Sequence, residues 1–176
     1  LLDLKFLFIE GNPSRDVLDV KNIFPPGTKL DHSLNDMYQS VYRYSALASD
    51  SVLQATEVIL REDAYGFKIK SIISGHGHAG PNYCCEWTKK WHSILINGKE
   101  QFRRNVWKDC GYNPVFPQGG TWPYDRAGWC PGTKVDEYSF EISDIVSPGD
   151  TILVDYEIEP MTDDKEGSGT YIMAYQ

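Results

Sequence analysis

The sequence predicts an all-β protein, an antiparallel β-sandwich of jelly-roll type with about eight strands and little helix. Short apolar segments rich in β-branched and aromatic residues recur roughly every ten residues. Turn residues, above all glycine, proline, asparagine and aspartate, separate these segments. No stretch shows the periodicity of a long amphipathic helix, and no internal repeat is present.

Length and composition indicate one globular domain over residues 1–176, since 41% of the 176 residues are hydrophobic and 13% are aromatic. The chain begins with Leu1 and shows no signal peptide or long apolar run, so we expect it to be part of a longer polypeptide. Its net charge is -8, and its basic pairs Lys89-Lys90 and Arg103-Arg104 are isolated. These features argue against nucleic acid and membrane partners and favour a neutral polar ligand such as carbohydrate.

The first strands are expected at Leu4–Glu10, ended by Gly-Asn-Pro, and at Val17–Phe24, ended by Pro-Pro-Gly. The segment Lys29–Asp50 is rich in serine, aspartate and tyrosine, which suggests irregular structure. Within it, Leu34–Leu47 could form one or two helical turns.

Two hairpins are expected in the middle of the chain. Ala55–Arg61 and Gly66–Ser74 flank a short polar turn. Trp91–Ile96 and Gln101–Val106 flank Asn97-Gly98, and Asn-Gly between two alternating runs is the strongest short hairpin signal. The remaining strands are predicted at Glu137–Ile142, Thr151–Glu159 and Thr170–Tyr175.

The segment Gln118–Gly132 has neither strand nor helix periodicity and contains four glycines, two prolines and two tryptophans. A loop of this length in a compact domain is often functional. Glycines let the backbone approach a ligand closely, and tryptophan offers a flat face for stacking. The alternative is a well-packed surface loop held by Cys130.

Within this loop, Asp125 and Arg126 stand among the aromatic residues Trp122, Tyr124 and Trp129. A guanidinium can polarise a carbonyl group or clamp a carboxylate. A tryptophan ring can stack on the apolar face of a sugar. The alternative is an Asp-Arg ion pair that only folds the loop.

Two further groups could carry chemistry. His76 and His78 alternate at a strand end and would face the same way in extended chain, so they could bind a metal with His92 or a methionine as a third ligand. Glycines around them equally suggest hydrogen-bonded histidines at a turning strand end. Glu86, between a cysteine and Trp87, is suited to acid-base or hydrogen-bonding work, or to a structural pair with an arginine.

The four cysteines have no zinc-binding spacing. Cys110 and Cys130 bracket the long loop, where a disulfide would contribute about 3 kcal/mol and would imply an oxidising compartment. The adjacent Cys84 and Cys85 are not expected to pair with each other. We expect at least one of them to bond elsewhere or to stay a buried thiol.

Five motifs occur in a characteristic order: SGHGHAGP, CCEW, HSILING, CGYNP and DRAGWCPG. Together they strongly resemble the C-terminal domain of the peptide:N-glycosidase F family, whose pattern includes S-G-x-G-H-A-x-P, C-x-E-W-C and D-R-A-G-W-C-P-G. The match is strong over about Ser71–Gly132, and the strand pattern on both sides is compatible with it.

The resemblance implies two jelly-roll domains side by side, with a fold like that of copper monooxygenases and an active site between them. It also implies hydrolysis of the amide joining asparagine to the innermost N-acetylglucosamine of N-glycoproteins and glycopeptides, without a metal or other cofactor. Glu86 matches the active-site glutamate of the family, Trp87 its neighbour, and Arg126 and Trp129 the arginine and tryptophan of the loop. We expect Glu86 and Arg126 to converge on one concavity.

The resemblance also implies a Cys110–Cys130 disulfide and a secreted or periplasmic location, and it places the primary catalytic aspartate on an N-terminal domain of the same polypeptide. Thr88 replaces the second cysteine of C-x-E-W-C, and His76 stands where the best-known member has tryptophan. His78 matches a family histidine. Two alternatives remain, a non-catalytic glycan-binding module and a metal-dependent monooxygenase-like domain that uses His76 and His78.

Overall fold

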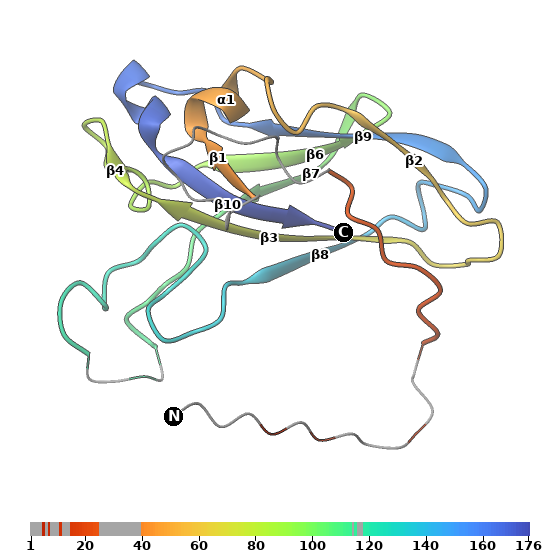
Figure 1. Cartoon of the computed structure of the whole chain (residues 1–176), viewed down its shortest axis with the longest axis horizontal. Coiled ribbons are helices and arrows are strands. Elements are labelled where there is room, and N and C mark those ends of the chain that lie inside the picture. Colours follow the sequence, from red (N-terminus) through yellow and green to blue (C-terminus); the bar gives the residue numbers. More distant parts are fainter. Residues whose placement is uncertain are drawn as a thin grey trace.

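The computed structural model describes residues 15–24, 40–113 and 118–176, together with residues 5, 7, 11 and 115. Two antiparallel four-stranded sheets lie one above the other (Figure 1). In spatial order, the first sheet contains β1 (Val41–Arg43), β10 (Thr170–Tyr175), β3 (Lys68–His76) and β8 (Glu137–Glu141). The second contains β2 (Thr56–Ile59), β9 (Thr151–Ile158), β6 (Trp91–Ile96) and β7 (Lys99–Asn105). The predicted all-β antiparallel sandwich is confirmed.

Helix is scarce in the described part of the chain. It consists of α1 (Tyr44–Ala48) and the 3₁₀ turn η1 (Asp164–Ser168). The helical turn expected within Leu34–Leu47 is present only as α1, and residues 34–39 lie outside the described residues. Among the described helices, none is long and apolar enough to cross a membrane.

The core lies between the two sheets, because side chains alternate between the faces of each strand. In β9 the buried residues are Ile152, Val154 and Tyr156, every second position, and β10 buries Tyr171, Met173 and Tyr175 in the same way. These side chains belong to one hydrophobic cluster that both sheets share. The strands predicted at Thr151–Glu159 and Thr170–Tyr175 are therefore confirmed, and each buries one of its two faces.

The hairpin predicted around Asn97-Gly98 is confirmed. β6 pairs with β7, and Ile96 lies opposite Lys99. Both turn residues have positive φ angles, 53° for Asn97 and 75° for Gly98. Asparagine and glycine tolerate this left-handed conformation better than other residues, which is why they form tight hairpin turns.

The hairpin predicted from Ala55–Arg61 and Gly66–Ser74 is wrong. Both segments contain strands, but β2 pairs with β9 in the second sheet and β3 pairs with β10 and β8 in the first. The connection between them crosses from one sheet to the other. Alternation identifies a strand and its buried face, but it does not identify the neighbouring strand.

The strand predicted at Val17–Phe24 is also wrong, since the segment is irregular. Val17, Leu18 and Val20 are exposed, and Ile23 and Phe24 are buried at its end. The Ile23 backbone N–H donates to the Tyr175 carbonyl at 3.1 Å. The apolar residues are thus divided between solvent and core in a segment that joins neither sheet. The strand predicted at Leu4–Glu10 lies outside the described residues, apart from positions 5 and 7.

His92 is buried in this core, and its Nδ1 lies 2.7 Å from the hydroxyl oxygen of Tyr156. Burial lowers the pKa of His92 from 6.5 to about 3. As the pH falls, His92 takes up a proton in the unfolded chain before it does so in the folded protein. The stability that depends on neutral His92 is therefore complete above about pH 6.5 and is lost as the pH falls towards 3.

We therefore expect the free energy of unfolding to fall by about 2 kcal/mol between pH 7 and pH 5, a window above the ordinary titration of carboxyl groups. Urea unfolding at the two pH values measures this. In His92→Gln, which cannot titrate, the difference should largely disappear. An equal difference in the variant would contradict the assignment.

Candidate functional site

A short hairpin and the long loop meet at the end of β3. The hairpin consists of β4 (His78–Ala79) and β5 (Cys84–Cys85), and Figure 1 shows β4 at the same end of the molecule as the loop. Two backbone hydrogen bonds join the three elements. The Ala127 N–H donates to the Glu86 carbonyl, and the Gly75 N–H donates to the Ala127 carbonyl, each at 2.9 Å.

Gly75 makes this close approach possible. A Cβ atom at this position would lie 2.0 Å from the carbonyl oxygen of Cys85 and 2.7 Å from the Cβ of Ala127. No side chain fits such a space, so the backbone of β3 can contact both the hairpin and the loop only if residue 75 is glycine. This glycine is the second residue of the SGHGHAGP motif, so that position of the motif has a structural reason.

Glu86 and Arg126 contact each other at this junction. The guanidinium Nε donates to Glu86 Oε1 at 3.0 Å, and the exposed side-chain fractions are 3% for Arg126 and 15% for Glu86. The two side chains come from positions 40 residues apart in the sequence. The structure therefore brings together the carboxylate and the guanidinium that the sequence analysis selected.

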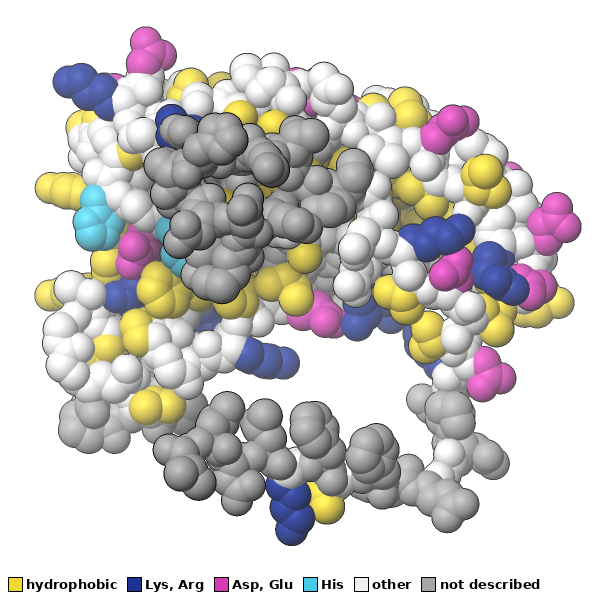
Figure 2. All heavy atoms as spheres, viewed as in Figure 1, with side chains coloured by type: hydrophobic (Ala, Val, Ile, Leu, Met, Phe, Trp, Pro, Cys, Tyr) yellow, Lys and Arg dark blue, Asp and Glu magenta, His cyan; other side chains and the backbone are white. Residues whose placement is uncertain are grey.

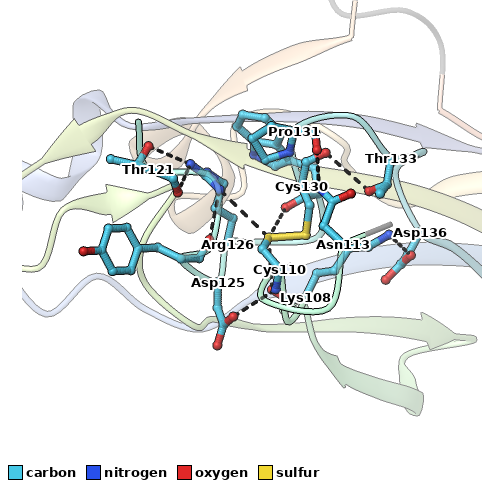
Figure 3. Close-up of a disulfide and its surroundings, with 12 residues drawn as sticks. Lys108, Cys110, Asn113, Thr121, Asp125, Arg126, Cys130, Pro131, Thr133 and Asp136 are labelled. Atoms are coloured by element: carbon cyan, nitrogen blue, oxygen red, sulfur yellow. Dashed lines mark hydrogen bonds and ion pairs between the residues drawn. A yellow bond between two sulfur atoms is a disulfide. The ribbon is translucent and has the colours of Figure 1, made fainter. Parts of the chain in front are cut away.

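The remaining donors of Arg126 point into its own loop (Figure 3). Nη1 donates to the Tyr124 carbonyl at 2.9 Å, and Nη2 donates to the carbonyl and hydroxyl oxygens of Thr121 at 2.8 and 2.9 Å. Arg126 thus fixes the loop and orients Glu86 at the same time. Thr121 is a member of the site that was not predicted from the sequence, and one of its two acceptors is a backbone carbonyl, which leaves no mark in a sequence.

Aromatic rings surround the guanidinium. Arg126 Cζ lies 4.4 Å from the ring centroid of Trp87 and 5.1 Å from that of Trp129, so both rings make cation–π contacts with it. Trp129 stacks with His76 at a centroid distance of 5.2 Å, and its indole N–H donates to the Gly75 carbonyl. The two tryptophan rings thus cover the guanidinium, and this buried cation would otherwise need another partner.

Two other residues proposed from the sequence lie in the same loop. Asp125 accepts a hydrogen bond from the Cys110 backbone N–H at 3.0 Å, so its carboxylate helps to close the loop (Figure 3). Trp122 is half-buried, and Tyr124 is 62% exposed with its ring edge against Trp87. The aromatic surface next to Glu86 therefore includes Tyr124.

The two histidines have different partners. His76 Nε2 lies 2.9 Å from Ser74 Oγ, whereas His78 Nε2 lies 3.5 Å from Glu86 Oε2. Burial lowers the pKa of His76, and the nearby Glu86 charge opposes this shift. Among the described residues, no three histidine, cysteine or carboxylate side chains gather in a way that could hold a metal ion. His92, considered as a third ligand, is instead a core residue.

Residues 43–176 match the family model described as "Peptide-N-glycosidase F, C terminal". The chain belongs to this family.

Relatives and solved structures agree with the family assignment. A peptide-N(4)-(N-acetyl-β-D-glucosaminyl)asparagine amidase F of Elizabethkingia miricola is 34% identical in an alignment of 112 residues that covers 57% of this chain and 29% of the relative. The structure of PNGase F, a glycosylasparaginase from Flavobacterium meningosepticum, has a TM-score of 0.64 at 28% identity and covers 70% of this chain and 42% of its own. A second amidase structure has a TM-score of 0.65 at 25% identity, covering 79% and 51%.

These similarities support the jelly-roll form of the sandwich and show a protein related to the peptide-N-glycosidases. The chain spans 29% of the length of the amidase from Elizabethkingia miricola. It therefore corresponds to one part of that longer protein.

Both pairs of cysteines in this member of the peptide-N-glycosidase F family form disulfides. Cys110 bonds to Cys130 across the loop, as expected (Figure 3). Cys84 bonds to Cys85, so the expectation that these two would not pair is wrong. The peptide bond between them is cis and brings their Cα atoms to 3.0 Å, closer than the 3.8 Å of a trans peptide.

This chain lacks the second cysteine of the family pattern C-x-E-W-C. Thr88 stands at the position of the second cysteine, and its hydroxyl donates to the Asn82 carbonyl. The Cys84–Cys85 bond lies within β5, and the Thr88 hydrogen bond joins the segment after Glu86 to the turn between β4 and β5.

Proposed function

We propose that this chain is the C-terminal jelly-roll domain, over residues 1–176, of a peptide:N-glycosidase. The proposed enzyme hydrolyses the amide between asparagine and the innermost N-acetylglucosamine of N-glycoproteins and glycopeptides, without a metal or other cofactor. The observation that carries the proposal is the Glu86–Arg126 pair, placed beside Trp87 in a chain of this family.

In this proposal Glu86 activates the attacking water or binds the N-acetylglucosamine–asparagine core. Arg126 has a positioning role, because its donors point at Glu86, Tyr124 and Thr121. The sequence-based hypothesis was that Arg126 supports the carboxylate cluster and polarises the scissile amide, and its contact with Glu86 favours the first of these roles. Trp87, Trp129 and Trp122 exclude water or contact sugar, and Asp125 supports the loop that carries them.

An N-terminal jelly-roll domain of the same polypeptide would supply the primary catalytic aspartate in this scheme. The lengths support this division, because the chain covers only part of its amidase relatives. The isolated chain would then be a half site that binds the glycan core weakly and does not cleave it. The two disulfides favour a secreted or periplasmic location.

Glycan release from an N-glycopeptide, followed by mass spectrometry, tests the function. We expect the full-length polypeptide to release the glycan and to convert the asparagine to aspartate, while the isolated chain does neither. Binding of the glycopeptide by the full-length polypeptide without any turnover would contradict the amidase and support a glycan-binding module. Activity that depends on added metal would support the oxygenase alternative.

A further inference from the structure

Three side chains form a row from the interior to the surface at the candidate site. Arg126 Nε contacts one carboxylate oxygen of Glu86 at 3.0 Å, and His78 Nε2 lies 3.5 Å from the other. Their exposed fractions rise along the row, from 3% for Arg126 to 15% for Glu86 and 63% for His78. His78 is therefore the member of this row that a substrate in solution would meet first.

The fold determines where this histidine lies. His78 pairs with Cys85 in the β4–β5 hairpin, so it stands across the hairpin from the residue directly before Glu86. Gly77, with a φ angle of +100°, turns the chain between His76 and His78, so the two imidazole rings contact different residues. The Trp87 ring lies 5.9 Å from the His78 ring and forms one side of its surroundings. Figure 2 shows a histidine and an acidic side chain exposed beside hydrophobic side chains at the end of the molecule that carries β4.

The chemistry of the three groups points to one proton donor. Arginine does not release a proton near neutral pH. Glu86 has its two oxygens directed at Arg126 and His78. Histidine is the side chain that gains and loses a proton near neutral pH, and a neighbouring carboxylate is suited to orient its ring. The outermost group of the row is thus also the one able to transfer a proton.

We propose that His78 is a further catalytic residue, which donates a proton to the leaving nitrogen; this rests on the function proposed above. The oxygen of water forms a bond to the side-chain carbonyl carbon of asparagine, and a carboxylate takes the proton of that water. The C–N bond then breaks, and the sugar nitrogen keeps the electron pair of that bond and accepts the proton of His78. His78 regains a proton from solvent, to which its exposure gives access, and the carboxylate releases to solvent the proton that it took from water.

In the described part of the chain, charged groups lie on three sides of the His78 environment. Glu86 faces it from the end of β5, with Arg126 behind, and His76 precedes it by two residues. β4 also packs against η1, whose charged residues are Asp164, Lys165 and Glu166. Glu166 is directed at Lys90. Among the described residues, the carboxylate that pairs with His78 is that of Glu86.

The test compares two substrates of the full-length polypeptide, a glycopeptide amide and the matching ester in which oxygen replaces the bridging nitrogen. His78→Gln should lower kcat/KM for the amide by about 10²–10⁴-fold, because an amine leaving group needs the proton. The loss for the ester should be within about tenfold, because an oxygen leaving group needs general-acid help far less. Added imidazole should restore part of the amide activity in His78→Ala but not in His78→Gln.

An amide loss within about tenfold, or equal losses on both substrates, would overturn the role of His78 alone. Failure of the unaltered polypeptide to cleave either substrate would overturn the proposed function and this inference with it. Because the His78 side chain is 63% exposed, we expect both variants to keep the melting temperature of the parent, which differential scanning calorimetry checks.

Discussion

Glu86→Gln in the full-length polypeptide is expected to lower the rate of glycan release by about 10²–10⁴-fold, the range typical for loss of an acid-base group. The amide has nearly the shape of the carboxylate, so it preserves the packing against Trp87 and the loop. It cannot take a proton from water, and it carries no charge to pair with Arg126 Nε at 3.0 Å. Single-turnover release from a glycopeptide measures the chemical step directly.

Glu57→Gln on β2 is the matched control, because Glu57 is exposed on the second sheet and β2 makes its strand pairs with β9. It undergoes the same change of side chain and should keep the parental rate. The structural effect of Glu86→Gln is checked by its free energy of unfolding in urea. A Glu86→Gln variant that folds and keeps the full rate would remove Glu86 from the proposed mechanism.

Structure that depends on local interactions could be predicted from the sequence, whereas pairing between distant segments could not. Strand alternation and the Asn97-Gly98 turn are local signals, and they correctly placed β9, β10 and the β6–β7 hairpin. Sheet partners are not local, so the pairing of β2 with β9 instead of β3 could not be read from either segment. The Cys84–Cys85 bond, against expectation, joins two neighbouring residues whose peptide bond is cis.

The same distinction holds at the site. Motifs of the family identified Glu86 and Arg126, and the structure places them in contact. The partners that define the role of Arg126 are mostly oxygens of Thr121 and Tyr124, two of them backbone carbonyls. Any residue type supplies a backbone carbonyl, so no pattern of side chains could show that the Nη1 and Nη2 donors of Arg126 are already hydrogen-bonded within the loop.

A buried ion pair supports the hairpin that carries this site. Glu166 is fully buried, and its carboxylate accepts from Asn82 at 2.7 Å, from the backbone N–H and hydroxyl of Thr162, and from Lys90 Nζ at 3.2 Å. Lys90 is 3% exposed, and its ammonium also lies over the Tyr44 ring. Asn82 belongs to the turn between β4 and β5, so this network ties the turn to the body of the domain.

Glu166→Gln should therefore lower the free energy of unfolding by about 3–5 kcal/mol, because it leaves the Lys90 ammonium buried without an opposite charge. Urea unfolding at pH 7 measures the loss. Glu166→Gln combined with Lys90→Met removes the uncompensated charge, so the double variant should be more stable than Glu166→Gln alone. If Lys90 were instead free to reach water, the single variant would lose less than about 1 kcal/mol and Lys90→Met would bring no recovery.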